Sequence, residues 1–403
     1  MRDPDLRSLV RAVRATRRGK KPSHARARYD ATWLDQVLDL ERRLLDGTWS
    51  PSPSVCFLTE RPKLREIHAP AYADRVLHQW MVPPIERRYE RIFIHDSYAN
   101  RRGKGTHAAV RRVHGFVRQV QSGQGDGHYL QLDVKNCFNR IRREKLYALL
   151  KAKLEKWSAP LSLRRAVHAL LRHPLAHAGV IYRCSPADRE RVPAHKRLAN
   201  APRGCGIAIG NLSSQFFVNV LLNELDQFVK HHLKVKRYVR YVDDFVLVHQ
   251  SREQLAAWKI EIERFLAEQL QLELKDDVRL RPLRDGIDFL GYIIYPTHVR
   301  VRRRVVMHAH EALRTIEHRH VRGRHLRATP AELRRIGSVW GSYAGHFMHA
   351  DSFRLRQAFH RRYPWLAEAA RPRQYHHRFE ERTLQVPFDA PPCAGFRARN
   401  LTP

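Results

Sequence analysis

The chain has 403 residues and a mass of 47.4 kDa, which is enough for about two or three subdomains with sizeable cores. Its 75 Lys and Arg outnumber 40 Asp and Glu and give a formal net charge of +35, so the expected partner is a polyanion bound through phosphates. No signal peptide and no apolar run of about 18 residues is found, which predicts a cytoplasmic protein that does not enter a membrane.

The N-terminal segment is strongly basic and is predicted to form a helical extension up to residue 60. The run Arg17-Arg18-Gly19-Lys20-Lys21 is typical of a flexible or RNA-bound segment. One helix is expected from Tyr29 to Leu45, because apolar residues recur there at three- and four-residue spacing: Trp33, Val37, Leu40 and Leu44.

Two basic turns follow before residue 121. The first is Pro62-Lys63-Leu64-Arg65-Glu66-Ile67-His68, and the second is Ser97-Tyr98-Ala99-Asn100-Arg101-Arg102-Gly103-Lys104-Gly105. Lys acts as a point charge and Arg as a planar fork on phosphate oxygens, so such turns suit an anionic ligand. An exposed basic turn without a ligand is the alternative, because Arg is abundant throughout the chain.

Three aspartates are predicted to lie at strand ends. Tyr129-Leu130-Gln131-Leu132-Asp133-Val134 predicts one strand, and Tyr241-Val242-Asp243-Asp244 lies between apolar runs that predict a hairpin with both carboxylates at its tip. Carboxylates in one small site repel each other unless a hard cation compensates them, and Mg²⁺ accepts carboxylate oxygen. An isolated Asp-Asp turn is more often only solvated. A third aspartate on a separate strand favours a two-metal site.

The segment between these strands contains a Gly-rich turn that leads into a helix. Residues 204–215 carry Gly at three positions, and an apolar stripe then recurs at helical spacing: Phe217, Leu221, Leu225 and Phe228. Ser213 or Ser214 is expected to cap this helix, and Gln215 is expected to stay free for contact with a base or template strand. Residues 151–203, before the turn, form a helical and basic insertion without an assigned role.

Four motifs occur in the order seen in the palm of prokaryotic reverse transcriptases, namely Asp133, Ile209–Gln215, Tyr241–Asp244 and Asp288-Phe289-Leu290-Gly291-Tyr292. The chain resembles that family over about residues 60–360, and motifs in the right order are far more specific than any one of them.

The resemblance implies a metal site. In such enzymes the first aspartate of the palm and the first aspartate of the tetrapeptide ligate both metals, which corresponds to Asp133 and Asp243 here. Val134 is added to the implied ligand set, and Asp244 is the supporting carboxylate. The implied cofactor is a pair of Mg²⁺ ions, for which Mn²⁺ can substitute.

The resemblance also implies a nucleotide site. Lys63 and Arg65 match the fingers hairpin that grips the triphosphate of the incoming dNTP, and Gln215 joins them as a nucleotide contact. Phe138 stands five residues after Asp133, where the family places a bulky residue that excludes the ribose 2′-hydroxyl. A plain core phenylalanine is the alternative.

Template and primer contacts are implied at Arg101, with Lys104 as the weaker candidate, and at Gly291 and Tyr292 in the last palm motif.

The segment around Lys275 is shorter than the lysine-bearing loop of the family. Two interpretations of Lys275 therefore stay open, a proton donor to pyrophosphate and a solvated side chain.

The implied fold class is α+β, a right-hand polymerase with fingers, a palm of antiparallel sheet plus helices, and a helical thumb. The expected domains are an N-terminal extension (1–60), fingers (61–121), palm (122–296, with the insertion 151–203), thumb (297–362) and a basic, Pro-rich tail (363–403). Trp340–Phe347 resembles the thumb of small bacterial enzymes. Its basic face should hold nucleic acid through phosphates, with RNA contacts expected at Arg302, Arg303, Arg304, Arg354 and Arg356.

The sequence therefore predicts an RNA-directed DNA polymerase that copies a structured noncoding RNA into cDNA. The motif at 209–215 resembles enzymes of diversity-generating retroelements and antiviral defence more than group II intron maturases, and no HNH-type endonuclease or zinc-finger cluster follows the thumb. Expected partners are the RNA, an RNA–DNA duplex, dNTPs, and an accessory protein or second reverse transcriptase. The alternatives are an idle RNA-binding scaffold, a maturase-like enzyme and an RNA-dependent RNA polymerase, which nucleotide preference would distinguish.

Overall fold

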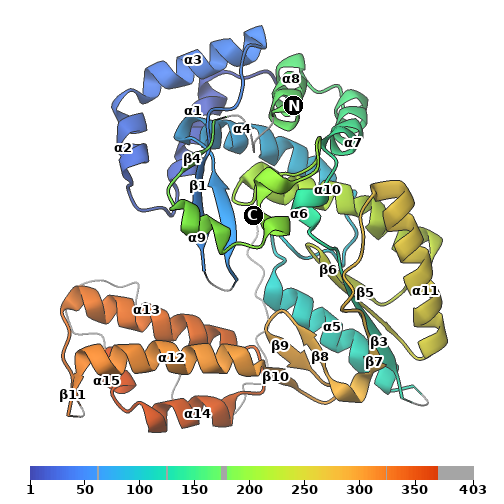
Figure 1. The fold of residues 1–403 in the computed structure, drawn as a ribbon, viewed down its shortest axis with the longest axis vertical. Coiled ribbons are helices and arrows are strands. Elements are labelled where there is room, and N and C mark those ends of the chain that lie inside the picture. Colours follow the sequence, from blue (N-terminus) through green and yellow to red (C-terminus); the bar gives the residue numbers. More distant parts are fainter. Residues whose placement is uncertain (61–62, 124–125, 174–178, 324, 371–403) are drawn as a thin grey trace, which may run out of the picture. The chain divides into compact units, whose positions relative to one another are not determined.

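The computed structural model describes residues 1–60, 63–123, 126–173, 179–323 and 325–370 (Figure 1). These residues divide into two compact units, one made of Met1–Leu290 with Tyr295–Thr297 and the other of Gly291–Ile294 with the chain from His298. Each unit has its own hydrophobic core. Most of the predicted tail lies outside the described residues.

The first unit begins with a layer of helices, α1 (Leu6–Arg17), α2 (His24–Ala31), α3 (Trp33–Asp46) and α4 (Tyr72–Tyr89). Asp5 and Ser8 form a reciprocal capping box that starts α1. Leu9, Ala12 and Val13 recur on one face of α1, and this face is buried where α1 packs on α4.

Two expectations for this layer need correction. The single helix expected from Tyr29 to Leu45 is interrupted at Thr32, where φ is −130° and ψ is 29°, so α2 ends and α3 begins there. Arg17 was assigned to a flexible or RNA-bound run, but it ends α1 and its Nε donates to Asp30 Oδ1 at 3.0 Å.

A small sheet with the order β2-β1-β4 follows, formed by β1 (Val55–Thr59), β2 (Arg65–Ala69) and β4 (Ile181–Tyr182). The antiparallel β1–β2 pair confirms the hairpin at the first basic turn. β4 comes from the insertion 151–203 and pairs in parallel with β1, through Val55 opposite Ile181. The insertion thus contributes a strand to the sheet of the predicted fingers.

The carboxylate-bearing strands share an antiparallel sheet with the order β5-β6-β3-β7, formed by β3 (His128–Asp133), β5 (Tyr238–Tyr241), β6 (Asp244–His249) and β7 (Arg279–Pro282). Four successive residues of β6 are buried, so both faces of this strand are covered. α11 (Arg252–Phe265) packs on β3, β6 and β7, and α5 (Thr106–Gln121) packs on β5 and β6 (Figure 1). The predicted hairpin and strand are confirmed.

The remaining elements of this unit are α6 (Cys137–Arg140), α7 (Arg143–Lys156), α8 (Leu161–Arg172), α9 (Pro186–Glu190), η1 (Ala194–Lys196), η2 (Leu198–Asn200), α10 (Leu212–Gln227), η3 (Phe228–His232), η4 (Leu266–Leu270), η5 (Leu283–Asp285) and β8 (Ile287–Phe289). α10 is apolar on most sides because it packs against both α4 and α7. The expected serine cap is wrong: Asn211 is the N-cap residue, and Ser213 and Ser214 are buried in the first turn.

The second unit consists of β9 (Tyr292–Ile294), β10 (Val299–Val301), α12 (Arg303–His320), β11 (Val321–Arg322), β12 (His325–Leu326), α13 (Pro330–Phe347), α14 (Phe353–Arg362) and α15 (Leu366–Ala370). Trp340, Phe347 and Phe359 lie in its core. The helical thumb expected here is in agreement with these elements. Among the described residues, no helix combines the length and apolarity needed to cross a bilayer.

Candidate active site

Three carboxylates meet at the end of the palm sheet. Tyr241 pairs with Asp244, so Val242 and Asp243 form the two-residue turn of the β5–β6 hairpin. Asp244 pairs in turn with Asp133 at the end of β3. Val242 has a φ of +58°, at a turn position that two-residue hairpins often give to glycine. The predicted aspartates therefore come together as expected.

Their electrostatics are those of a crowded anionic site. Burial and the charges of Asp133 and Asp243 raise the pKa of Asp244 to about 7, although a hydrogen bond from Gln131 opposes the shift. Burial and then Asp133 also raise the pKa of Asp243. Both shifts have the sign expected when like charges share a low-dielectric site. A cation placed among them would relieve this repulsion.

Two neighbours already bond to the cluster. Lys275 Nζ lies 2.5 Å from Asp133 Oδ2, and its backbone N–H donates to Asp133 O at 2.8 Å. Lys275 is therefore engaged with the site, and its interpretation as a merely solvated lysine is wrong. Gln131 Nε2 donates to Asp244 Oδ1 at 3.2 Å and to Asp288 O at 3.0 Å.

The cluster also offers an acceptor for a divalent ion. Asp133 Oδ1 is buried and has no hydrogen-bond partner among the described residues. Among the residues that the structure describes, no group of three or more His, Cys, Asp or Glu side chains is arranged to hold a metal ion by itself. Mg²⁺ commonly binds one or two carboxylates together with water and substrate phosphates. The donor set therefore fits an ion whose shell substrate oxygens would complete.

Of the predicted triphosphate residues, Arg65 is the first residue of β2 and Lys63 lies just before the strand. Lys63 and Arg65 are exposed, and the charge of Arg65 opposes the rise in the pKa of Asp243, which places its guanidinium within electrostatic reach of the carboxylates. The strand is seated on the Gly-rich turn: His68 N–H donates to Ile209 O at 3.0 Å. A Cβ on Gly210, whose φ is +118°, would lie 2.8 Å from a methyl group of Ile67.

Phe138 and Gln215 are placed near this strand-and-turn region. Phe138 lies on α6, which directly follows β3, and its backbone oxygen accepts from Ile207 N at 2.9 Å. Its ring is partly exposed and packs against the core, which fits either a steric gate or a core phenylalanine. Gln215 is exposed in the first turn of α10.

Arg101 does not fit its predicted role. Its side chain is only 5% exposed and forms a forked ion pair with Glu90, with Nη2 at 2.8 Å. Nη1 donates to the backbone oxygens of Ile94 and Ser97. A guanidinium so fully bonded inside the protein is not presented to a template. Lys104 donates to His95 O at 2.9 Å.

The other predicted nucleic-acid residues belong to the second unit. Tyr292 is fully buried: its ring stacks on His346 at 4.2 Å, and its hydroxyl donates to His346 O at 2.8 Å. Its side chain is therefore not available to template or primer, which corrects that expectation. Gly291, whose φ is +90°, lies close to the same imidazole, which an added Cβ would meet at 3.2 Å.

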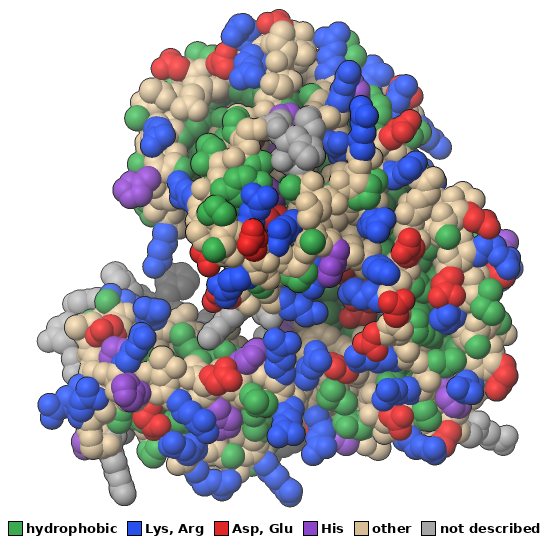
Figure 2. Space-filling view, in the orientation of Figure 1, with side chains coloured by type: hydrophobic (Ala, Val, Ile, Leu, Met, Phe, Trp, Pro, Cys, Tyr) green, Lys and Arg blue, Asp and Glu red, His purple; other side chains and the backbone are tan. Residues whose placement is uncertain are grey.

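The predicted RNA-binding arginines lie on the surface of that unit. Exposed side chains gather at the start of α12 and of α14: Arg302, Arg303, Arg304 and Arg354. Arg356 is partly buried. Figure 2 shows Lys and Arg side chains, with His among them, over the visible face of this unit. Dense positive charge of this kind suits contact with a phosphate backbone.

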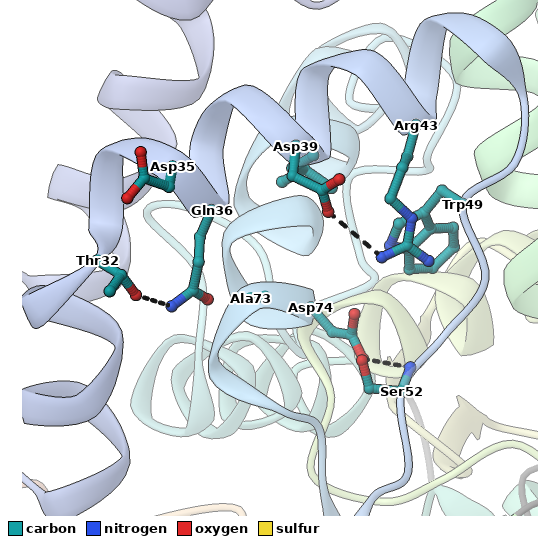
Figure 3. Close-up of a pocket in the computed structure, with 10 residues that line it drawn as sticks. Thr32, Asp35, Gln36, Asp39, Arg43, Trp49, Ser52, Ala73 and Asp74 are labelled. Atoms are coloured by element: carbon teal, nitrogen blue, oxygen red, sulfur yellow. Dashed lines mark hydrogen bonds and ion pairs between the residues drawn. The ribbon is translucent and has the colours of Figure 1, made fainter.

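A cavity of about 390 Å³ opens between α3 and α4 (Figure 3). Its polar side chains bond mainly with one another or with nearby backbone. Gln36 donates to Thr32 Oγ1 at 2.8 Å, and Asp74 Oδ2 accepts from Ser52 N at 2.8 Å. None of the clustered carboxylates lines it. The cavity is therefore not the active-site candidate.

The sequence interpretation missed a buried ion pair beside the carboxylate turn. Arg240 on β5 and Asp226 on α10 are both 0% exposed, with Nη2 and Oδ2 2.6 Å apart. The available signal was a single charged residue, Arg240, within an apolar strand, and two acidic residues, Glu224 and Asp226, within the apolar helix α10. A charge is rarely buried unless it is paired, so each residue implied a partner that the sequence could not identify.

Comparison with known protein families gives a match over residues 59–294, to the family described as "Reverse transcriptase (RNA-dependent DNA polymerase)". This segment covers more than half of the chain and includes β2, the Gly-rich turn and the three carboxylates. The match and the α+β architecture confirm the predicted fold class.

Curated relatives include the group II intron-encoded protein LtrA of Lactococcus lactis subsp. cremoris, with 23% identity over 319 residues, 67% of this chain and 50% of LtrA. Protein YkfC of Escherichia coli K12 is 24% identical over 290 residues, 63% of this chain and 69% of YkfC. The chain thus spans half the length of LtrA. Among solved structures, apo telomerase from Candida tropicalis aligns with a TM-score of 0.45 at 12% identity, covering 62% of this chain and 56% of the telomerase.

Proposed function

Because the chain belongs to the reverse transcriptase family, we propose that it is an active RNA-directed DNA polymerase. The observation that carries the proposal is the convergence of Asp133, Asp243 and Asp244 at the end of the palm sheet, with one buried carboxylate oxygen unpartnered. A scaffold that had lost catalysis would have no chemical use for three mutually repelling carboxylates.

Asp133 and Asp243 are the proposed ligands of two Mg²⁺ ions, with the Val134 backbone beside them. Bound ions would favour deprotonation of the primer 3′-hydroxyl and neutralise charge on the pyrophosphate leaving group. Asp244 accepts a hydrogen bond from Gln131 and is proposed to add negative charge beside the two metal ligands. Lys275, which bonds to Asp133, is the proposed proton donor to the pyrophosphate.

Lys63 and Arg65 are the proposed triphosphate contacts. The proposal is supported by the exposure of both side chains, at and just before the start of β2, and by the close contact of this strand with the Gly-rich turn before α10. A point charge and a planar fork together suit phosphate oxygens. Phe138 is the proposed gate against the 2′-hydroxyl, and Gln215 the proposed base or template contact.

For the template, we propose a structured noncoding RNA, copied in antiviral defence or in a diversity-generating retroelement. The proposal is supported by the net charge of +35, by the exposed arginines of the second unit, and by the form of the 209–215 motif. A maturase-like reverse transcriptase is the second candidate, because the similarity to a group II intron-encoded protein favours it.

Primer extension on defined substrates tests the polymerase proposal. The purified chain with Mg²⁺ should extend a DNA primer on an RNA template with dNTPs and should fail with Asp243→Asn. A wild-type chain that binds the duplex but adds no nucleotide would favour the idle scaffold, and one that prefers NTPs would favour an RNA-dependent RNA polymerase.

Sequencing the RNA that copurifies with the protein tests the template proposal. One structured RNA enriched over total RNA, and depleted by the Arg302, Arg303 and Arg304 to Ala variant, is the expected result. Enrichment of a self-splicing intron would instead support the maturase-like candidate.

A further inference from the structure

A fully buried ion pair lies next to the carboxylate turn. Arg240 Nε donates to Asp226 Oδ1 at 2.7 Å, and Nη2 donates to Oδ2 at 2.6 Å. The Tyr238 hydroxyl adds a third bond to the same carboxylate, at 2.8 Å. The carboxylate thus holds the guanidinium in one orientation, because a fork–fork pair fixes both position and plane.

The remaining donors of Arg240 reach other elements. Nη2 donates to Ser97 Oγ at 3.1 Å, and Nη1 donates to Asn219 Oδ1 at 3.2 Å and to Val242 O at 2.9 Å. A guanidinium has five N–H donors in a rigid fork, and these bonds use all of them. The bond to Val242 O is the one that carries the network into the metal-binding turn.

That turn requires support. Val242 has a φ of +58°, and a β-branched residue in this region is a conformational outlier. Such a backbone persists only where the surroundings fix it. Two bonds do so here: Arg240 holds the Val242 carbonyl, and Val134 N–H holds the Asp243 carbonyl at 3.1 Å.

The backbone of Arg240 ties the same strand to the 96–98 segment. Arg240 N–H donates to Asp96 O and Tyr98 N–H donates to Arg240 O, each at 3.0 Å. The residue is therefore fixed through its side chain and its backbone together. Little freedom is left for the turn that follows it.

We propose that Arg240 is a positioning residue for the metal site. By holding the Val242 carbonyl, it stabilises the backbone conformation of the turn and so sets the direction from which the Asp243 carboxylate meets a divalent ion. Asp226 acts through Arg240 by fixing the guanidinium. The proposal rests on the metal-binding role proposed above for Asp243.

A purely architectural role is the competing explanation, because the ion pair also joins α10 to β5. Removal of an architectural pair should lower the melting temperature and leave the affinity of the folded protein for metal unchanged. Removal of a positioning residue should weaken metal binding in protein that is still folded. Mn²⁺ binding measured by electron paramagnetic resonance, without nucleotide or primer, separates the two.

The first variant is Arg240→Lys, which keeps a positive charge beside Asp226 but cannot reproduce the planar fork. Loss of such an outer contact typically weakens metal affinity or activity by about 10- to 100-fold, and we expect this range for the Mn²⁺ midpoint and for kcat. KM for dNTP and the Kd for RNA should stay close to wild type. Arg17→Lys, in the Arg17–Asp30 pair between α1 and α2, is the matched control and should change none of these values.

A second variant guards against misfolding. Arg240→Met combined with Asp226→Leu removes both charges and leaves no unpaired ion in the core. It should fold and still bind Mn²⁺ weakly. Addition of Val242→Gly, which adopts a positive φ without strain, should recover part of the lost affinity. Wild-type Mn²⁺ binding by the folded double variant, or no recovery in the triple variant, would overturn the proposal.

Hydrogen exchange on the wild-type protein tests the same idea without any substitution. The Val134 amide donates to the turn, so it should be protected as strongly as the amides inside β3, and rapid exchange there would overturn the proposal. Mn²⁺ binding does not require catalysis. A wild-type protein that bound Mn²⁺ but made no DNA would therefore contradict the proposed function, while the Mn²⁺ measurements on the Arg240 variants would still test the positioning role.

Discussion

The three clustered aspartates have the same side chain but different surroundings. Asp133 is bonded to Lys275 through one oxygen and has the other unpartnered among the described residues. Asp244 accepts from Gln131, and its pKa is raised to about 7. Asp243 lies in the turn itself, held through its backbone by Val134. Substitutions of these three aspartates should therefore differ in their effects, although the side chains are identical.

Asp243→Ala should abolish DNA synthesis and leave RNA binding nearly intact, because the carboxylate is proposed to bind metal and not the nucleic-acid backbone. Primer extension and RNA affinity are measured on the same preparation. Asp277→Ala is the control, since the Asp277 side chain is 73% exposed and pairs with Arg279 on the surface. Synthesis by Asp243→Ala within about tenfold of wild type would contradict the metal role, because loss of an essential ligand costs far more.

Phe138→Ala should admit ribonucleotides, since the loss of the ring opens space for a 2′-hydroxyl. The measurement is the ratio of incorporation of a ribonucleotide to its deoxy partner. Phe217→Leu, a change in the fully buried core of α10, is the control that lowers stability without touching the sugar. An unchanged ratio for Phe138→Ala, with a lower melting temperature, would show that the residue is only part of the core.

At the scale of elements, the position of the β1–β2 hairpin depends on close contact with the Gly-rich turn. His68 bonds to Ile209, and Gly210 leaves no room for a side chain against Ile67. The strand that begins at Arg65, just after Lys63, is thereby set against the turn that leads into α10. Crowding at Gly210 should displace the proposed phosphate contacts without altering the carboxylates.

Gly210→Ala should raise KM for dNTP more than it lowers kcat, because misplacing a binding group by about 1 Å can cost up to about a hundredfold. Gly105→Ala is a matched control: its φ of +119° imposes the same backbone strain, but nothing lies within 4 Å of the added methyl group. Steady-state kinetics with varied dNTP give both parameters. Similar effects of the two variants would show that backbone strain, and not displacement of β2, is responsible.

Local pattern predicted the palm strands well and the contacts between distant elements poorly. The apolar runs around Asp133 and Asp243 identified β3, β5 and β6, because buried strands impose their composition on consecutive residues. The buried contacts of the Arg101 side chain could not be predicted from such a local pattern. Its partner Glu90 is the C-cap residue of α4, eleven residues earlier, and a basic turn has the same composition whether it is exposed or paired inward.

At the scale of the whole molecule, both units carry an excess of positive charge. In the second unit, part of this charge belongs to the exposed arginines at the start of α12. Release of counterions from phosphates makes such binding strongly dependent on salt. The charge therefore predicts a measurable slope of affinity against salt concentration.

The slope in question is that of the logarithm of the binding constant against the logarithm of the salt concentration. Replacement of Arg302, Arg303 and Arg304 by Ala should make this slope less steep by about 2 to 3, because each lost phosphate contact removes about 0.7–0.9. The control is replacement of the exposed Arg7, Arg11 and Arg14 of α1, which removes the same charge from another surface. Affinity for structured RNA is measured between about 50 and 200 mM salt, where wild-type binding should weaken by orders of magnitude. A wild-type slope in the Arg302–Arg304 variant would assign the charge to another partner.

The pairing of β4 with β1 has a consequence for shortening the chain. Deletion of residues 179–203 would leave the outer edge of β1 without its parallel neighbour, because Ile181 N–H and Arg183 N–H now donate to the oxygens of Ser54 and Cys56. An uncovered strand edge is a template for pairing between molecules. A segment that contributes no residue to the carboxylate cluster would then decide whether the protein remains dispersed at working concentration or associates through the edge of β1.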